Sequence, residues 1–126
     1  MNFLKGYKND AGVDVILRTD VELKPKTMNV IDLGISVKVR KGEMAFLVSR
    51  TSAAKNGVLV MQCPIDADYS GTINAIVYNF NDSPLIYPAG SSFCQIVYVP
   101  IKYRINCETK KKGRRTNSKF GETDKK

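Results

Sequence analysis

Short runs of β-branched and aromatic residues, separated by turn-forming residues, most constrain what this chain can fold into. Gly, Pro, Asn and Asp fall between the runs, and turn signals recur about every 8–12 residues. No segment keeps a 3.6-residue apolar period long enough for a substantial helix, and the best helix candidate is a short turn at 52–55. This pattern predicts an all-β, antiparallel fold of the sandwich, jelly-roll or small-barrel type. The expected strands are 13–17, 21–23, 30–39, 44–48, 58–61, 72–80, 85–87 and 93–101.

The positive charge is concentrated at one end of the 126 residues. The chain carries 20 Lys+Arg and 12 Asp+Glu, a net charge of +8, but residues 1–101 hold 10 basic and 9 acidic side chains. From about Thr109 onward, Phe120 is the only large apolar residue, so this stretch cannot bury enough surface to order itself. We therefore predict a β domain at 1–108 and a flexible basic arm at 109–126. The arm is either a solubilising end or a segment that closes over an anion.

Histidine is absent, which excludes Ser-His-Asp and Cys-His catalysis and any His-ligated zinc site. Three widely spaced cysteines, Cys63, Cys94 and Cys107, form no CxxC pair and are expected to be reduced and partly buried. No apolar run approaches the roughly 18 residues of a membrane span, and the N-terminus has no signal-peptide core. We expect an intracellular, cytoplasmic protein, or a nuclear or host-cell protein if the source is viral.

Four segments carry side chains suited to phosphate chemistry. Residues 66–71 (DADYSG) place two carboxylates and a phenol in a turn, although Asp and Gly there are also ordinary turn formers. Asp14 begins a strand behind a glycine. Residues 49–52 (SRTS) combine a cation with hydroxyls, a suitable setting for phosphate oxygens, and Gln95 is an amide inside an otherwise apolar strand.

Taken in order, these four segments and residues 115–123 of the arm resemble the five motifs of the trimeric dUTPase family. AGVDV resembles AGYDL, SRTSAAKNGV resembles PRSS followed by a glycine, and PIDADYSGTI resembles GVIDxDYxGxI. YPAGSSFCQIVYVPI is similar to KGDRIAQLV, and RTNSKFGET to RGxGGFGST. The resemblance runs from about residue 11 to 123. It implies an antiparallel jelly roll or distorted β-barrel that forms a homotrimer with intersubunit active sites. The implied activity is hydrolysis of dUTP to dUMP and pyrophosphate.

The resemblance also implies roles for individual residues. Asp66 matches the general base that activates the attacking water at the α-phosphorus, and a carboxylate suits that task in a chain without histidine. Tyr69 matches the ring that packs on the deoxyribose and excludes a 2′-hydroxyl. Ile65 lies in the hairpin that reads uracil, where Cys63-Pro64 replaces the family's glycine and valine.

The remaining matched residues are assigned to the phosphates, the metal and the base. Arg50, Thr51, Ser52 and Gln95 match phosphate ligands, and Asp14 matches the acid that contacts Mg²⁺ through water while the ion binds mainly to substrate phosphates. In the arm, Arg115 matches a phosphate ligand and Phe120 the aromatic that stacks on uracil. The glycines expected after the arm's arginine are missing, so the arm must rely more on side chains.

Three alternatives stay open on the sequence. A dCTP deaminase-like enzyme needs a glutamate about ten residues beyond the general base, where Ile76 stands. A non-catalytic regulator could share the fold and the surface. A nucleic-acid binder using the basic arm is disfavoured, because the body is almost neutral and offers no stacking platform among basic residues.

Overall fold

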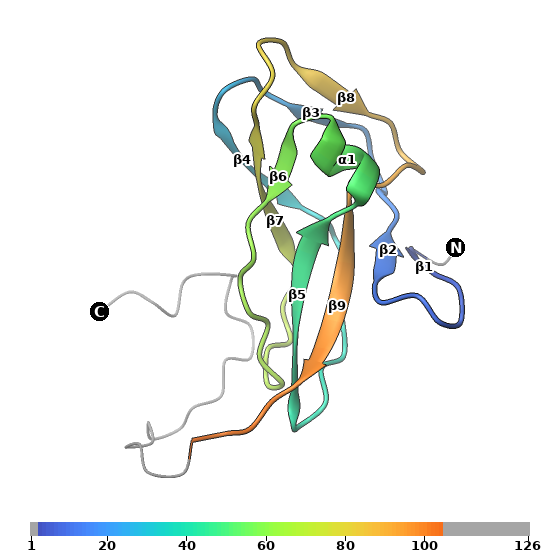
Figure 1. The fold of residues 1–126 in the computed structure, drawn as a ribbon, viewed down its shortest axis with the longest axis vertical. Coiled ribbons are helices and arrows are strands. Elements are labelled where there is room, and N and C mark those ends of the chain that lie inside the picture. Colours follow the sequence, from blue (N-terminus) through green and yellow to red (C-terminus); the bar gives the residue numbers. More distant parts are fainter. Residues whose placement is uncertain (1–2, 105–126) are drawn as a thin grey trace.

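The computed structural model describes residues 3–104, and within them the fold is built almost entirely from short antiparallel strands (Figure 1). The single helix in this range, α1, has five residues. The elements in chain order are β1 (Leu4–Lys5), β2 (Val13–Val15), β3 (Val21–Leu23), β4 (Met28–Asp32), β5 (Glu43–Ser49), α1 (Thr51–Lys55), β6 (Val58–Val60), β7 (Asn74–Asn79), β8 (Leu85–Tyr87) and β9 (Cys94–Pro100). The predicted all-β class is confirmed.

Three sheets form the body. The largest has the order β1-β2-β9-β5, the second has the order β4-β7-β6, and β3 pairs with β8 alone. Every pairing between these strands is antiparallel. Because β9 lies between β2 and β5, it brings together strands that are about 30 residues apart in the chain (Figure 1).

The core lies between the sheets and follows the two-residue period of the strands. In β7, Ala75, Val77 and Asn79 are buried while the residues between them are partly exposed. The fully buried Asn79 is satisfied, since its Nδ2 donates to the carbonyls of Leu23 (3.0 Å) and Ser83 (3.1 Å). The amide therefore ties the end of β7 to β3 and to the turn that follows β7, which a purely apolar side chain could not do.

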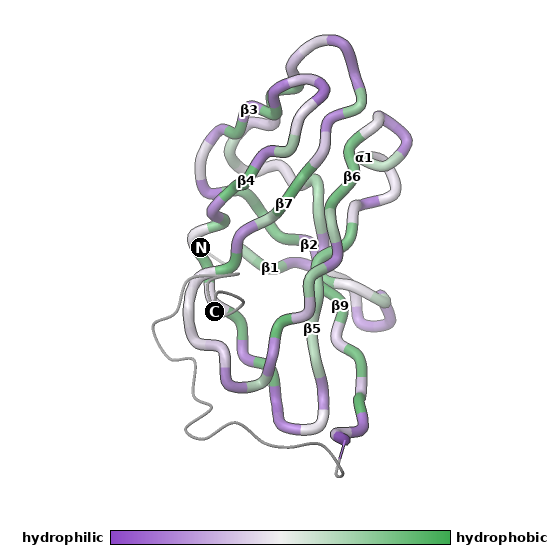
Figure 2. Tube along the Cα trace, turned by 90° about the vertical axis from the view of Figure 1, so that its left-hand side faces the viewer, coloured by the Kyte–Doolittle hydropathy of each residue, from purple (hydrophilic) through white to green (hydrophobic). Residues whose placement is uncertain are grey.

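The other face of the β4-β7-β6 sheet is also apolar, although it faces away from the core. Tyr78 is paired with Met28 on one side and Leu59 on the other, and Val30 is paired with Ile76. Met28, Val30 and Leu59 are 48%, 67% and 45% exposed. A sheet with one solvated face normally alternates apolar and polar residues, which this one does not do. We call this surface, formed by Met28, Val30, Leu59, Ile76 and Tyr78, the outer apolar face. In Figure 2, these strands show apolar green segments between polar purple ones.

The strand expected at 30–39 was wrong in its second half, because β4 ends at Asp32. The Asp32 Oδ1 accepts a hydrogen bond from the Gly34 N–H at 2.8 Å, and Gly34 has a φ of +69°. This local turn breaks the extended backbone, as an Asp two residues before a positive-φ glycine favours.

β1 was not predicted, since two residues carry no periodic pattern. In residues 3–104, no helix has the length and apolar character needed to cross a membrane.

Candidate active site

The end of β5 places a guanidinium next to an acid from another strand. Arg50 follows Ser49, the last residue of β5, and its Nε lies 3.4 Å from the Asp14 Oδ1 on β2. The Arg50 Nη1 donates to the Ser92 carbonyl at 3.2 Å. Both side chains of the ion pair are partly exposed, at 40% and 34%. The sheet order therefore holds a cation in a set direction at the surface, ready for an anionic ligand.

Gln95 completes this group from the central strand β9. It is the register partner of both Asp14 on β2 and Val48 on β5, and its Nε2 donates to the Ser49 carbonyl at 3.4 Å. A Cβ atom added at Gly12 would lie 2.4 Å from the Gln95 Oε1, so glycine is what allows the amide to sit there. We call Asp14, Arg50 and Gln95 the arginine cluster.

Two hydroxyl side chains and a phenol surround the arginine cluster. Thr51 and Ser52 begin α1 directly after Arg50, and both are exposed. Burial raises the pKa of Tyr87, and the neighbouring Arg50 charge partly offsets that rise. The phenol therefore stays protonated near neutral pH and can act as a hydrogen-bond donor.

The second group of predicted residues lies in the turn after β6. Ile65 is buried and exchanges two backbone hydrogen bonds with Ala45 of β5, at 3.2 and 2.7 Å. Asp66 follows it, and the Tyr69 N–H donates to the Asp66 carbonyl at 3.1 Å. The Tyr69 hydroxyl donates to the Thr72 carbonyl at 2.7 Å, which anchors the ring. We call Ile65, Asp66 and Tyr69 the Asp66 turn.

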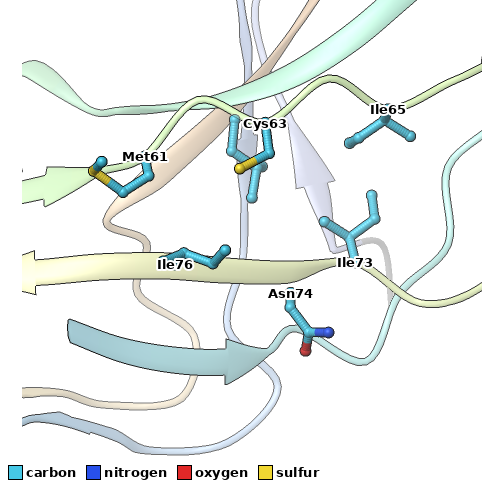
Figure 3. A pocket seen from close by; sticks show the side chains of 7 residues that line it. Met61, Cys63, Ile65, Ile73, Asn74 and Ile76 are labelled. Atoms are coloured by element: carbon cyan, nitrogen blue, oxygen red, sulfur yellow. The ribbon is translucent and has the colours of Figure 1, made fainter. Parts of the chain in front are cut away.

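Two cavities near the Asp66 turn differ in their size and in how open they are. An open cavity of about 490 Å³ is lined by residues 36–39 and 67–70, including the Tyr69 ring. Close by, the 61–65 segment and β7 enclose a narrow apolar cleft, into which Cys63 directs its sulfur toward β7 (Figure 3). Ile76, the residue at the deaminase glutamate position, contributes an aliphatic side chain to this cleft.

The described cysteines are free, as predicted. Cys63 is half-buried, while Cys94 is fully buried on β9. Burial raises the pKa of the Cys94 thiol to about 12, and the negative charge of Asp14 adds to the effect. Cys94 is therefore an inert core residue rather than a nucleophile. Cys107 lies outside the described residues.

The arginine cluster and the Asp66 turn lie at opposite ends of β5. Ile65 is bridged to Ala45, and the antiparallel direction carries Asp66 farther from Arg50. The five to six residues between these points span about 17–20 Å of extended strand. A hydrogen bond reaches only about 3 Å between heavy atoms. The two groups of one chain are therefore too far apart to act on the same phosphate.

Described residues offer no closed protein cage for a metal. No three His, Cys, Asp or Glu side chains in residues 3–104 come together as a ligand set. Asp14 is a single carboxylate beside an arginine, which fits an outer contact to a Mg²⁺ ion held mainly by phosphate oxygens and water. The predicted arm at 109–126, with Arg115 and Phe120, lies outside the described residues.

A model of the dUTPase family matches residues 2–124. The chain belongs to the dUTPase family. Among its relatives, the dUTPase of Clostridium tetani, a deoxyuridine 5′-triphosphate nucleotidohydrolase, is 33% identical over 94% of this chain and 86% of its own length. That of Cutibacterium acnes is 34% identical over 73% of this chain and 63% of its own length.

Viral proteins are also similar to this dUTPase family member. The Pol polyprotein of an ovine maedi visna related virus is 32% identical over 90% of this chain, which spans only 11% of that polyprotein. EIAV dUTPase has a TM-score of 0.75 at 21% identity, covering 88% of this chain and 93% of that one. A dUTPase mutant of the S. aureus phage phi11, described with a structural Mg(II) ion, has a TM-score of 0.72 at 21% identity, covering 83% of this chain and 86% of that one. These structures confirm the fold.

Sequence reasoning assigned no role to some residues that line the site. Ser92 is buried and orients Arg50 through its carbonyl, a contact that only the β5–β9 register reveals. Lys5 and Tyr7 line an open cavity beside Arg50. They lie in a segment before the first recognisable motif, so no spacing rule could have selected them.

Proposed function

We propose that this protein hydrolyses dUTP to dUMP and pyrophosphate, which limits uracil incorporation into DNA and supplies dUMP for thymidylate synthesis. The observation that carries the proposal is the dUTPase family match over residues 2–124, within which both the arginine cluster and the Asp66 turn occur. The relatives named deoxyuridine 5′-triphosphate nucleotidohydrolase support the same substrate.

Asp66 is proposed as the general base. Its carboxylate would accept the proton of the water that attacks the α-phosphorus, which places the new P–O bond on dUMP and releases pyrophosphate. Tyr69 would pack its ring on the deoxyribose, and its hydroxyl is already tied to the Thr72 carbonyl. A fixed ring leaves little freedom to accommodate an added 2′-hydroxyl, and it leaves that hydroxyl without a partner.

Phosphate binding is proposed for the arginine cluster. Arg50 would form charge-assisted hydrogen bonds to phosphate oxygens, with Gln95 and the hydroxyls of Thr51 and Ser52 as neutral donors. Asp14 would contact a phosphate-bound Mg²⁺ through water; when bound, that ion neutralises phosphate charge. Arg115 and Phe120 are proposed to close over phosphate and uracil from the arm.

A homotrimer with shared sites would bring the two groups together. Within one chain about 17–20 Å of β5 separates Arg50 from Asp66, so the base of one subunit would serve phosphates held by another. The outer apolar face supports this assembly, since Val30, Met28 and Leu59 expose a contiguous apolar surface that a second copy would cover.

Comparison of nucleotides tests the proposal. Pyrophosphate release should be measured with Mg²⁺ and dUTP, dTTP, dCTP or UTP, and dUTP should be turned over in preference to the others. Asp66→Asn should abolish release while leaving the folded assembly intact. Ammonia release from dCTP would instead indicate a deaminase, and an inert wild type that still binds nucleotide would indicate a regulator.

A further inference from the structure

An open cavity of about 600 Å³ lies between the N-terminal segment and the arginine cluster. Asp14 and Arg50 line it, together with Lys5, Tyr7 and Asp10 of the N-terminal segment, which we call the N-terminal wall. The motif resemblance begins at about residue 11, so the N-terminal wall is additional to the phosphate ligands proposed above.

The position of the Lys5 side chain is set by the pairing of β1 with β2. It lies on β1 directly opposite Asp14 of β2, and directly opposed residues in an antiparallel pair direct their side chains to the same face. Lys5 is exposed, and it forms no ion pair with any residue in the range 3–104. Its ammonium group is therefore available on the face that carries the Asp14–Arg50 pair.

The loop that follows Lys5 is shaped before any ligand binds. The Tyr7 N–H donates to the Asp10 Oδ2 at 2.7 Å, and the Asp10 N–H donates to the Tyr7 carbonyl at 3.1 Å. These reciprocal bonds close a turn and hold the Asp10 Oδ2 against the Tyr7 N–H. The acid on this wall is thus directed to its own loop rather than to Lys5.

The charge balance of the arginine cluster calls for another cation. Arg50 is partly neutralised by Asp14 at 3.4 Å, and the nearby hydroxyls and Gln95 are uncharged. A nucleoside triphosphate carries several negative charges, and each desolvated phosphate oxygen needs a donor. The arm lacks the glycines expected after Arg115, which would let its backbone N–H groups approach phosphate closely. The ammonium group of Lys5, next to Asp14 on the same face, would supply part of that need.

We propose that Lys5 is a phosphate-binding residue, contacting the β- or γ-phosphate of the substrate from the N-terminal wall of this cavity. The proposal rests on the proposed dUTP hydrolysis for the identity of the nucleotide, and it concerns the pyrophosphate portion common to substrate and product. Lys5 would bind phosphate in the ground state, so its loss should affect KM more than kcat.

The test compares Lys5→Gln, Lys5→Arg and the matched control Lys8→Gln. Lys8 is exposed in the same loop and does not line the cavity, so its variant removes the same charge from the same segment. For Lys5→Gln we expect KM for dUTP and the inhibition constant of pyrophosphate to rise about 5- to 10-fold at low salt. We expect kcat within about twofold, the effect to shrink at high salt, and Lys5→Arg to restore most of the affinity.

Equal KM and inhibition constants in Lys5→Gln and Lys8→Gln would overturn the proposal. A lower melting temperature in Lys5→Gln that Lys5→Arg does not restore would also overturn it, because the loss of affinity would then reflect loss of structure. Calorimetric titration of each variant with pyrophosphate alone separates this proposal from the proposed reaction. If the wild type fails to hydrolyse dUTP but binds pyrophosphate more tightly than Lys5→Gln does, the reaction is refuted and the Lys5 site stands.

Discussion

Gly12→Ala should damage the proposed phosphate site while leaving the fold nearly unchanged. The added Cβ would lie 2.4 Å from the Gln95 Oε1 and 3.0 Å from its Cδ, whereas ordinary contact begins at 3.4 Å. The amide must therefore move by about 1 Å from its present position. Gly12 is not among the positive-φ glycines, so its backbone accommodates alanine. The atom that must move is the free end of a flexible side chain, which limits the cost to folding.

The expected magnitudes differ between stability and activity. Displacing Gln95 removes its 3.4 Å hydrogen bond to the Ser49 carbonyl, worth about 1 kcal/mol at most. Replacing glycine by alanine stabilises the fold by about 0.4–1 kcal/mol, because alanine lowers the conformational entropy of the unfolded chain. The melting temperature should therefore shift by only a few degrees. A lost hydrogen bond to a charged phosphate is worth about 1.5–3 kcal/mol, or about 10- to 100-fold in kcat/KM.

A double-mutant cycle isolates the cause. Gly12→Ala and Gln95→Ala should each lower kcat/KM for dUTP by about 10- to 100-fold, and the double variant should be no worse than Gln95→Ala alone, because the obstructed side chain is gone. Gly6→Ala is the control for stability, since its Cβ would meet atoms only at 3.5 Å and beyond. Losses that simply add in the double variant would refute the argument that Gly12 acts through Gln95.

Three further results are expected. The free energy of unfolding should fall by up to about 1.4 kcal/mol per pH unit between pH 9 and 12, because the Cys94 thiol has a pKa of 9.0 when unfolded and about 12 when folded. In urea titrations, the free energy of unfolding of Cys94→Ala should depend less on pH over this range; an equal dependence would contradict this. Asn79→Ala should cost about 2–4 kcal/mol in urea unfolding, because it empties a buried site and leaves the Leu23 carbonyl unpaired; a cost below 1 kcal/mol would contradict that role. Val30→Lys with Leu59→Lys should convert the proposed homotrimer to monomers in light scattering and abolish dUTP turnover. A trimer of unchanged mass would show that another surface forms the contact.

The strands were predictable where side-chain alternation and turn residues agree. β3 and β8 match the expected ranges, and β5, β7 and β9 differ by a residue or two at their ends. The expected strand at 30–39 continued too far because its apolar residues alternate on both sides of Gly34, and only the Asp32 turn shows where the backbone bends. Local periodicity cannot detect a break that one side chain makes by bonding to the backbone.

The residues of the candidate site could be proposed from the sequence, but their grouping could not. Asp14 lies on β2, Gln95 lies on β9 and Arg50 directly follows β5. Their proximity follows from the order β2-β9-β5, which no spacing rule gives. Ser92 acts through a backbone carbonyl, so its residue type carried no signal. The separation of Asp66 from Arg50 likewise appears only when the Ala45 bridge fixes the register.

On the proposed function, the surroundings of Arg50 would let one arginine favour a metal-bound triphosphate. One of its five N–H donors goes to the Ser92 carbonyl and Nε faces Asp14, so the guanidinium is oriented before a phosphate arrives and less rotamer entropy is lost on binding. The same Asp14 charge opposes a bare phosphate, because it lies 3.4 Å from the cation that the phosphate would approach. A phosphate that carries Mg²⁺ turns this repulsion into attraction. On the proposed function, the Asp14–Arg50 pair therefore selects for the charge state of the ligand, and an added cation such as Lys5 strengthens binding without removing that selection.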